Sequence, residues 1–183
     1  MSDGSDGSDG SDGTDGTDDA LRDFPGLVNR AARGLAELSD ERARERPAPD
    51  KWSPREVLGH LIDSAVNNYG RFVRAGAGAE LVFEGYDQEQ WVAAQDVGAA
   101  PWAELVELWR LLNLAVARIV GAVPEDVRLR EHARHNLHEV AWEAVPASEA
   151  ATLDYFVRDY VGHLQHHLRQ IDARLAPPPA KQR

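Results

Sequence analysis

Two groups of histidines in this chain have the spacing that a metal site between helices requires. His163 and His167 lie four residues apart in a segment with helical periodicity, so their side chains share one helix face. His60 lies in a second segment of this kind. A third imidazole from a facing helix would complete three nitrogen ligands and leave a coordination position open, as catalytic metal sites do. The alternative is three partly exposed histidines that make ordinary hydrogen bonds.

Composition narrows the classes of partner. The net charge is −11 over 183 residues, but residues 1–20 contain seven Asp and no Lys or Arg, and the remainder carries 24 acidic and 20 basic side chains. A chain without a basic stripe is not expected to bind nucleic acid. The sequence has no cysteine, which excludes disulfides, a cysteine nucleophile and thiolate-ligated metals.

The ends of the chain differ in composition from its middle. Ser-Asp-Gly repeats open the sequence, and with nothing apolar to bury they predict a disordered acidic tail over residues 1–22. The folded domain is expected over residues 23–176, followed by a second disordered tail over 177–183. No apolar run approaches the ~20 residues of a membrane span, and the acidic start is unlike a targeting signal. A cytoplasmic protein without membrane contact is therefore expected.

Apolar periodicity predicts four long helices, over residues 24–46, 53–76, 101–121 and 152–175. Ser53, Pro54 and Glu56 form a strong start signal, with a capping serine, a proline at the first position and a glutamate that closes the capping box. A short helix is expected at residues 88–94, while residues 122–150 are expected to be mostly loop. Without a convincing strand pair, the pattern indicates an all-α four-helix bundle.

Two further groups of side chains have a structural and a functional interpretation. The aromatic residues are expected to fill the core and line the wall of a pocket; they are Trp52, Tyr86, Trp91, Trp102, Trp109 and Trp142. His132, His135 and His138 follow one another at intervals of three residues and could form a second metal site. The favoured interpretation is a solvated loop.

Several motifs occur in the order typical of one known family. They are Lys-Trp-Ser-Pro-Arg-Glu-Val at 51–57, followed by His60 and Asp-Ser at 63–64, then Tyr-Asp-x-x-x-Trp at 86–91, and Asp-Tyr-Val-x-His-x-x-His-His-Leu-x-Gln-Ile at 159–171. This ordered set resembles the DinB-like superfamily, particularly its YfiT-like branch. The resemblance covers residues 27–175, although residues 131–150 diverge from it.

The resemblance implies a four-helix bundle in which His60, His163 and His167 bind one divalent ion, usually zinc or nickel. Three neutral ligands leave the charge of such an ion uncompensated, so that it lowers the pKa of a bound water towards ~7 or deprotonates a bound thiol. Asp63 is the candidate catalytic residue, because it could orient an imidazole or accept a proton. A salt bridge or a helix cap is its structural alternative.

Candidate substrate contacts are Asn67, Arg71 and His166, each with a structural role as the alternative. The family includes transferases that use low-molecular-weight thiols, so we expect transfer of a thiol such as bacillithiol to an electrophilic small molecule. Metal-dependent hydrolysis is the second possibility within the enzyme class. A non-catalytic metal-binding or stress-response module is the alternative from another class, and the resemblance also implies a homodimer.

Overall fold

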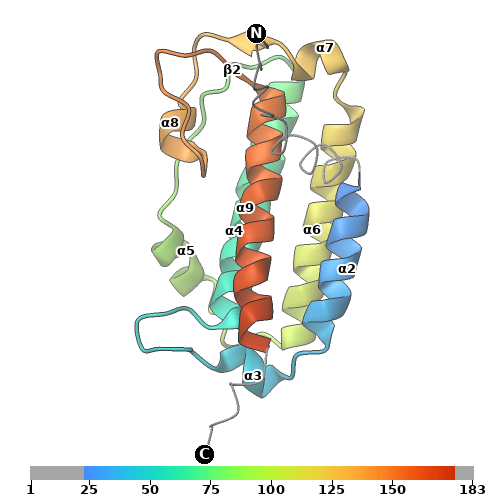
Figure 1. Ribbon diagram of the computed structural model, residues 1–183, viewed down its shortest axis with the longest axis vertical. Coiled ribbons are helices and arrows are strands. Elements are labelled where there is room, and N and C mark those ends of the chain that lie inside the picture. The colour runs from blue at the N-terminus through green and yellow to red at the C-terminus, as the bar shows by residue number, and fades with distance from the viewer. Residues whose placement is uncertain (1–22, 176–183) are drawn as a thin grey trace, which may run out of the picture.

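The computed structural model describes residues 23–175, with side chains as far as Asp172. The two tails predicted to be disordered, residues 1–22 and 177–183, lie outside the described residues. Four long helices dominate the structure: α2 (Phe24–Ala36), α4 (Pro54–Gly76), α6 (Trp102–Ala122) and α9 (Leu153–Leu175). They form the predicted all-α four-helix bundle (Figure 1). None of the described helices combines the length and apolarity needed to cross a membrane.

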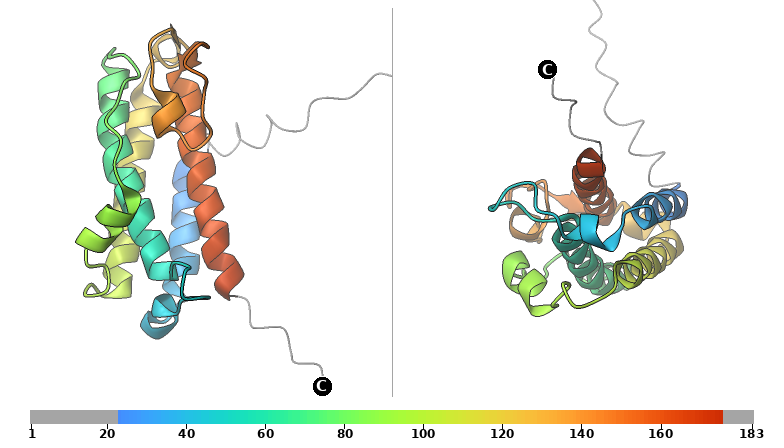
Figure 2. Two further views of the ribbon diagram at one scale, coloured as in Figure 1. Left: turned by 90° about the vertical axis from the view of Figure 1, so that its left-hand side faces the viewer. Right: turned by 90° about the horizontal axis from the view of Figure 1, so that it is seen from below.

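The order in which the helices are connected places α4 between α6 and α9. In Figure 1, α2 and α9 run downwards, whereas α4 and α6 both run upwards. Two neighbouring helices can be parallel here because the long segment 77–101 returns along the outside of α4 and carries α5 (Gln88–Ala94). Helix α4 packs on both α6 and α9, and α2 packs on α6 (Figure 2). The site helices α4 and α9 are therefore neighbours, although they are far apart in sequence.

Local capping interactions explain where the site helices begin. At α4, the Ser53 side chain accepts a hydrogen bond from the Glu56 backbone N–H, and the Glu56 carboxylate accepts from the Ser53 backbone N–H at 2.8 Å, which is the predicted capping box. At α9, Thr152 Oγ1 accepts from the Tyr155 backbone N–H at 3.0 Å. Both helix starts are thereby fixed, which sets the register of the histidines that follow.

The prediction of a single helix over residues 24–46 is wrong. Helix α2 ends at Ala36, and a separate helix α3 (Asp40–Arg44) begins after Ser39, whose side chain accepts from the Arg42 backbone N–H. The Trp102 indole N–H donates to the Leu35 carbonyl oxygen at 2.8 Å. The Leu35 carbonyl oxygen also accepts from the Leu38 backbone N–H at 3.1 Å, so a local and a tertiary hydrogen bond meet at the end of α2. Apolar periodicity continued through the break because Leu38 and Ala43 are both buried.

Residues 122–150 contain more regular structure than the predicted loop. Helices α7 (Glu125–Arg128) and α8 (Leu137–Val140) lie in this segment, and strand β1 (Glu131–His132) pairs antiparallel with β2 (Ala151–Thr152). The expectation that no strand pair would form is therefore wrong, although each strand has only two residues. Strands this short carry too little periodicity to be recognised in a sequence.

The three histidines of this segment do not gather into a second metal site. Among the described residues, the group of side chains that could hold an ion does not include them. His135 is buried, and its Nε2 donates to the Glu149 carbonyl oxygen while its Nδ1 accepts from the Leu137 backbone N–H. The interpretation as a solvated loop is thus wrong for His135, which connects the start of α8 to Glu149 near the end of the segment, whereas His138 is exposed.

The aromatic residues divide between the core and the pocket. Trp102 and Trp109 are buried in the core, as predicted. Trp91 and Trp142 are 38% and 45% exposed, so the expectation of a core position is wrong for Trp91. Trp142 and Tyr86 instead line the pocket described below.

We predict that Arg55→Ala lowers the free energy of unfolding by about 2–3 kcal/mol, because a buried arginine that satisfies several acceptors is lost. Arg55 is 2% exposed, pairs with Asp40 and donates to the carbonyl oxygens of Val97 and Ala100, so it joins α3, α4 and the start of α6. Urea denaturation measures the loss. The exposed Arg33→Ala is the control, and equal stability of both variants would contradict the prediction.

Candidate metal centre

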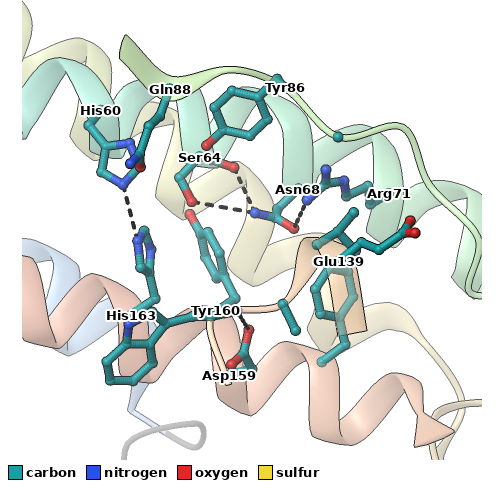
Figure 3. Close-up of a pocket in the computed structure, with 15 residues that line it drawn as sticks. His60, Ser64, Asn68, Arg71, Tyr86, Gln88, Glu139, Asp159, Tyr160 and His163 are labelled. Carbon is teal, nitrogen blue, oxygen red and sulfur yellow. Dashed lines mark hydrogen bonds between the residues drawn. The ribbon is translucent and has the colours of Figure 1, made fainter. Parts of the chain in front are cut away.

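Three imidazoles from two helices converge at one point of the bundle. His60 comes from α4, and His163 and His167 come from successive turns of α9; one ring nitrogen from each lies within 4.8 Å of the others. His60 Nε2 and His163 Nε2 are 3.1 Å apart, as Figure 3 shows. Four-coordinate zinc lies about 2.0–2.1 Å from each imidazole nitrogen, which places two nitrogens on one ion roughly 3.4 Å apart. The separation of His60 Nε2 and His163 Nε2 is close to this value, and the wider separations, up to 4.8 Å, would close around an ion through small rotations of the side chains.

Burial keeps two of these histidines in the form that binds metals. His60 is 4% exposed, and desolvation, aided by the neighbouring His167, lowers its pKa to about 4. Desolvation and the adjacent imidazoles lower the pKa of His163 to about 3. Both rings are therefore neutral at pH 7, and a neutral imidazole offers the lone pair that a cation needs.

Gln170 determines the orientation of the third imidazole. The Gln170 side-chain oxygen lies 3.1 Å from His167 Nδ1, and its amide nitrogen lies 2.8 Å from His166 Nε2. An oxygen can only accept, so His167 Nδ1 carries the proton and Nε2 keeps its lone pair. Metal-ligating histidines usually have such a partner on the second nitrogen. Gln170 belongs to the α9 motif, and its spacing of three residues from His167 could have indicated this role.

Asp63 does not have the contacts expected of it. Asp63 Oδ2 and His60 Nδ1 are both buried and make no hydrogen bond with any described residue, so Asp63 does not orient His60. Asp63 is also absent from the described lining of the pocket. Asp63 is 3% exposed. Desolvation raises the pKa of its carboxyl to about 6, although a hydrogen bond from Gln95 acts to lower it.

A pocket of about 340 Å³ opens beside His60 and His163 (Figure 3). On α4 its lining continues through Ser64, Asn68 and Arg71. At about 100° per residue, Ser64 lies about 40° from His60 on one side of the helix and Asp63 about 60° on the other. The pocket is on the Ser64 side, which explains why Asp63 does not reach it.

Of the three predicted substrate contacts, only Arg71 lines this pocket. Asn67 instead donates to the Asp63 backbone carbonyl on its own helix at 2.9 Å, and its neighbour Asn68 takes the lining position. His166 is half-buried, bonds to Gln170 and packs against the Trp142 ring at 5.2 Å between centroids. His166 therefore lies next to the histidine cluster without facing the pocket.

Asp159 is a pocket residue to which the sequence assigned no role. Its two carboxylate oxygens accept hydrogen bonds from the backbone N–H groups of Trp142 and Glu143, at 3.0 and 2.7 Å. Burial raises the pKa of Asp159 in spite of these bonds. The same segment packs closely on α9, since a Cβ on Gly162 would lie 3.4 Å from the Trp142 ring. Asp159 thus fixes Trp142 over the rim of the pocket.

The amino-acid sequence matches that of a known protein family. The family model described as the DinB superfamily matches residues 28–171. The chain belongs to the DinB superfamily. The match covers α4 and α6 completely and most of α2 and α9, and it includes the three clustered histidines.

Three relatives of this chain carry the same descriptive name. A protein of Oceanobacillus iheyensis is 22% identical over 156 residues, which are 85% of this chain and 83% of the relative. One of Bacillus licheniformis is 26% identical over 153 residues, 84% of this chain and 80% of the relative. One of Bacillus mycoides is 25% identical over 151 residues, 82% and 80% of the two chains. Each is named "Putative metal-dependent hydrolase".

A solved structure shares the fold. YfiT from Bacillus subtilis, described as "a probable metal-dependent hydrolase with an unusual four-helix bundle topology", matches with a TM-score of 0.68. It is 21% identical in sequence, and the match covers 93% of this chain and 92% of YfiT. The described part of this DinB-superfamily chain therefore shares the four-helix bundle fold of YfiT.

Proposed function

We propose that this protein is a divalent-metal-dependent enzyme that transfers a low-molecular-weight thiol to an electrophilic small molecule. The observation that carries the proposal is the convergence of three imidazoles within 4.8 Å beside a pocket of about 340 Å³. A ligand set with no carboxylate or cysteine among its three members leaves the charge of the ion uncompensated. Such a site suits the binding of an anionic nucleophile.

The donor set fits the proposed cofactor. Imidazole nitrogens suit zinc and nickel among the common divalent ions, whereas calcium and magnesium require oxygen ligands. His60, His163 and His167 would hold the ion. When bound, it would supply Lewis acidity that lowers the pKa of a thiol or a water molecule in the open position.

The residues around the site partly cover the histidines and supply contacts for a substrate. Trp52 covers His60 at 5.5 Å between ring centroids, and Trp142 lies 6.1 Å from the His163 ring. Ser64, Asn68 and Tyr86 add polar groups along the pocket wall. Burial, with smaller electrostatic contributions, raises the pKa of Tyr86 to about 12, so its hydroxyl stays protonated. It is therefore able to donate a hydrogen bond to a substrate.

Two observations bear on the choice between thiol transfer and hydrolysis. Metallohydrolases commonly place a free carboxylate beside the ion as a general base. Here the oxygens of Asp159 already accept from two backbone N–H groups, and Asp63 does not line the pocket. A thiol with a low pKa needs no such base, which favours thiol transfer. The names of the relatives favour metal-dependent hydrolysis, which is the second candidate function.

Elemental analysis and one assay test the proposal. We expect the untagged protein to contain about one equivalent of zinc or nickel. The metal-loaded protein should consume a thiol such as bacillithiol together with a chromogenic electrophile, and removal of the ion by a chelator should stop the reaction. Turnover of chromogenic esters without a thiol would support hydrolysis instead. Absence of both reactions, with a melting temperature that falls on chelation, would indicate a structural metal in a non-catalytic module.

A further inference from the structure

Arg71 carries a buried charge with which no acidic side chain of the described residues forms an ion pair. It is 4% exposed and lines the pocket at the far end from the histidines (Figure 3). Its Nη2 donates to the Glu84 carbonyl oxygen at 2.6 Å, and its Nη1 lies 3.5 Å from Asn68 Oδ1. The guanidinium carbon lies 5.8 Å from the centre of the Phe83 ring. All three partners are formally neutral.

The acidic groups of the pocket do not neutralise this cation. Asp159 uses its oxygens for the Trp142 and Glu143 backbone N–H groups. Glu139 is exposed, and its carboxylate accepts from the Asn136 side chain. Neither forms an ion pair with Arg71 in the described part of the chain, in contrast to Arg55, whose buried guanidinium pairs with Asp40. A buried charge without a counter-ion is unfavourable unless a ligand supplies one.

We propose that Arg71 binds an anionic group of the substrate, a carboxylate or a phosphate, while the opposite end of the same molecule lies at the three histidines. A guanidinium presents a planar set of donors that matches both of these anions. This inference rests on the proposed function and adds the chemical class of the substrate, an elongated molecule with a negative charge at one end.

Helix geometry sets the length of that molecule. Arg71 is eleven residues after His60 on α4, a rise of about 16 Å, and its guanidinium leans back towards Asn68, at a rise of about 12 Å. The bond to the ion and the hydrogen bonds to the guanidinium take up part of the ~12 Å rise. The anion and the reacting group of the molecule should therefore be roughly 8 Å apart. Ser64 and Asn68 lie between the two ends and line the same wall.

The test compares two thiols of one length, 6-mercaptohexanoate and 6-mercaptohexanol, by calorimetric titration of zinc-loaded protein at low salt. We expect the acid to bind at least ten-fold more tightly than the alcohol. Arg71→Gln should abolish this preference, and Arg71→Lys should retain part of it. Arg74→Gln, which removes the same charge from an exposed position on α4, should leave it unchanged. Equal affinities in the unmodified protein, or a preference that survives in folded Arg71→Gln, would overturn the proposal.

A metal-independent measurement separates this proposal from the proposed function. In metal-free protein titrated with inorganic phosphate, the Arg71 Nε–H signal should shift saturably in ¹⁵N-resolved NMR spectra, and the signals of exposed arginines should not. If neither thiol binds but this shift occurs, the thiol-binding function fails and the anion site stands. If the thiols bind equally and phosphate shifts nothing, the anion site fails and the metal site stands. If neither thiol binds and phosphate shifts nothing, both fail.

Discussion

His163→Ala is expected to lower the affinity for zinc at least 100-fold. His163 contributes the ring nitrogen nearest to His60, at 3.1 Å, so its removal leaves two ligands on separate helices. Loss of one of three imidazoles removes a metal–nitrogen bond and also opens the site to water, whereas outer-shell substitutions typically cost 10–100-fold. Competition with a chromogenic chelator at pH 7.5 measures the dissociation constants.

His166→Ala is the matched control for this measurement. It removes the same kind of side chain three residues further along α9, but His166 does not belong to the cluster of His60, His163 and His167. We expect its zinc affinity to change less than three-fold. If His163→Ala bound zinc as tightly as the unmodified protein, or if both variants lost affinity equally, the three histidines would not form the metal centre. Circular dichroism spectra establish that each variant is folded.

Metal-free protein is expected to lose about 2 kcal/mol of stability between pH 7.5 and pH 5.0, which is the net of a loss of about 2 kcal/mol from each of two buried histidines and an opposing gain from buried carboxyls. The pKa values of His60 and His163 are lowered in the folded state to about 4 and about 3, from about 6.5 in the unfolded chain. Below pH 6.5 the unfolded state therefore binds more protons than the folded state, and the free energy of unfolding falls as the pH falls. Most of this loss occurs between pH 6.5 and pH 5.0, and the histidine contribution continues to grow down to about pH 4.

The buried carboxyls have the opposite sign. Burial raises the pKa of Asp63 to about 6 in the folded state, so between pH 6 and pH 4 the folded state gains protons that the unfolded state lacks. Asp159 acts in the same direction. Asp63→Asn removes the larger offset and should deepen the loss at pH 5.0 by about 1 kcal/mol. Urea denaturation after chelation measures both effects, and a free energy that stays constant over this range would contradict the assigned shifts.

The bundle was predictable because its signals are local and repeated. Each long helix has many turns of apolar periodicity, and the capping box at Ser53 fixes one start to the residue. The break after Ala36 was missed because the hydrogen bond from Trp102 to Leu35 joins segments 67 residues apart. Such a contact leaves no periodic pattern in either segment.

In the candidate site too, the residues set by local spacing were predicted, and those set by tertiary packing were not. The spacing of His163 and His167 is sufficient to place them on one face of one helix. His60 was a candidate because it lies in a second amphipathic segment, and the family motif supported it as the third ligand. Asp63 and Ser64 are comparable neighbours of His60 on a helical projection, and only the packing of α4 against α9 and its covering segments decides which one faces the pocket. The role of Asp159 depends on two backbone N–H groups in an irregular segment, which a motif does not place.

The arrangement of α4 and α9 has a consequence for the folding of a chain that lacks disulfides. His60 and His163 are 103 residues apart, so an ion shared between them would close a loop of about a hundred residues. A covalent cross-link of that length stabilises a protein by about 4.7 kcal/mol in the chain-entropy description. The proposed ion would act as a reversible cross-link between the same two positions, and its complete ligand set would form only once α9 has packed against α4.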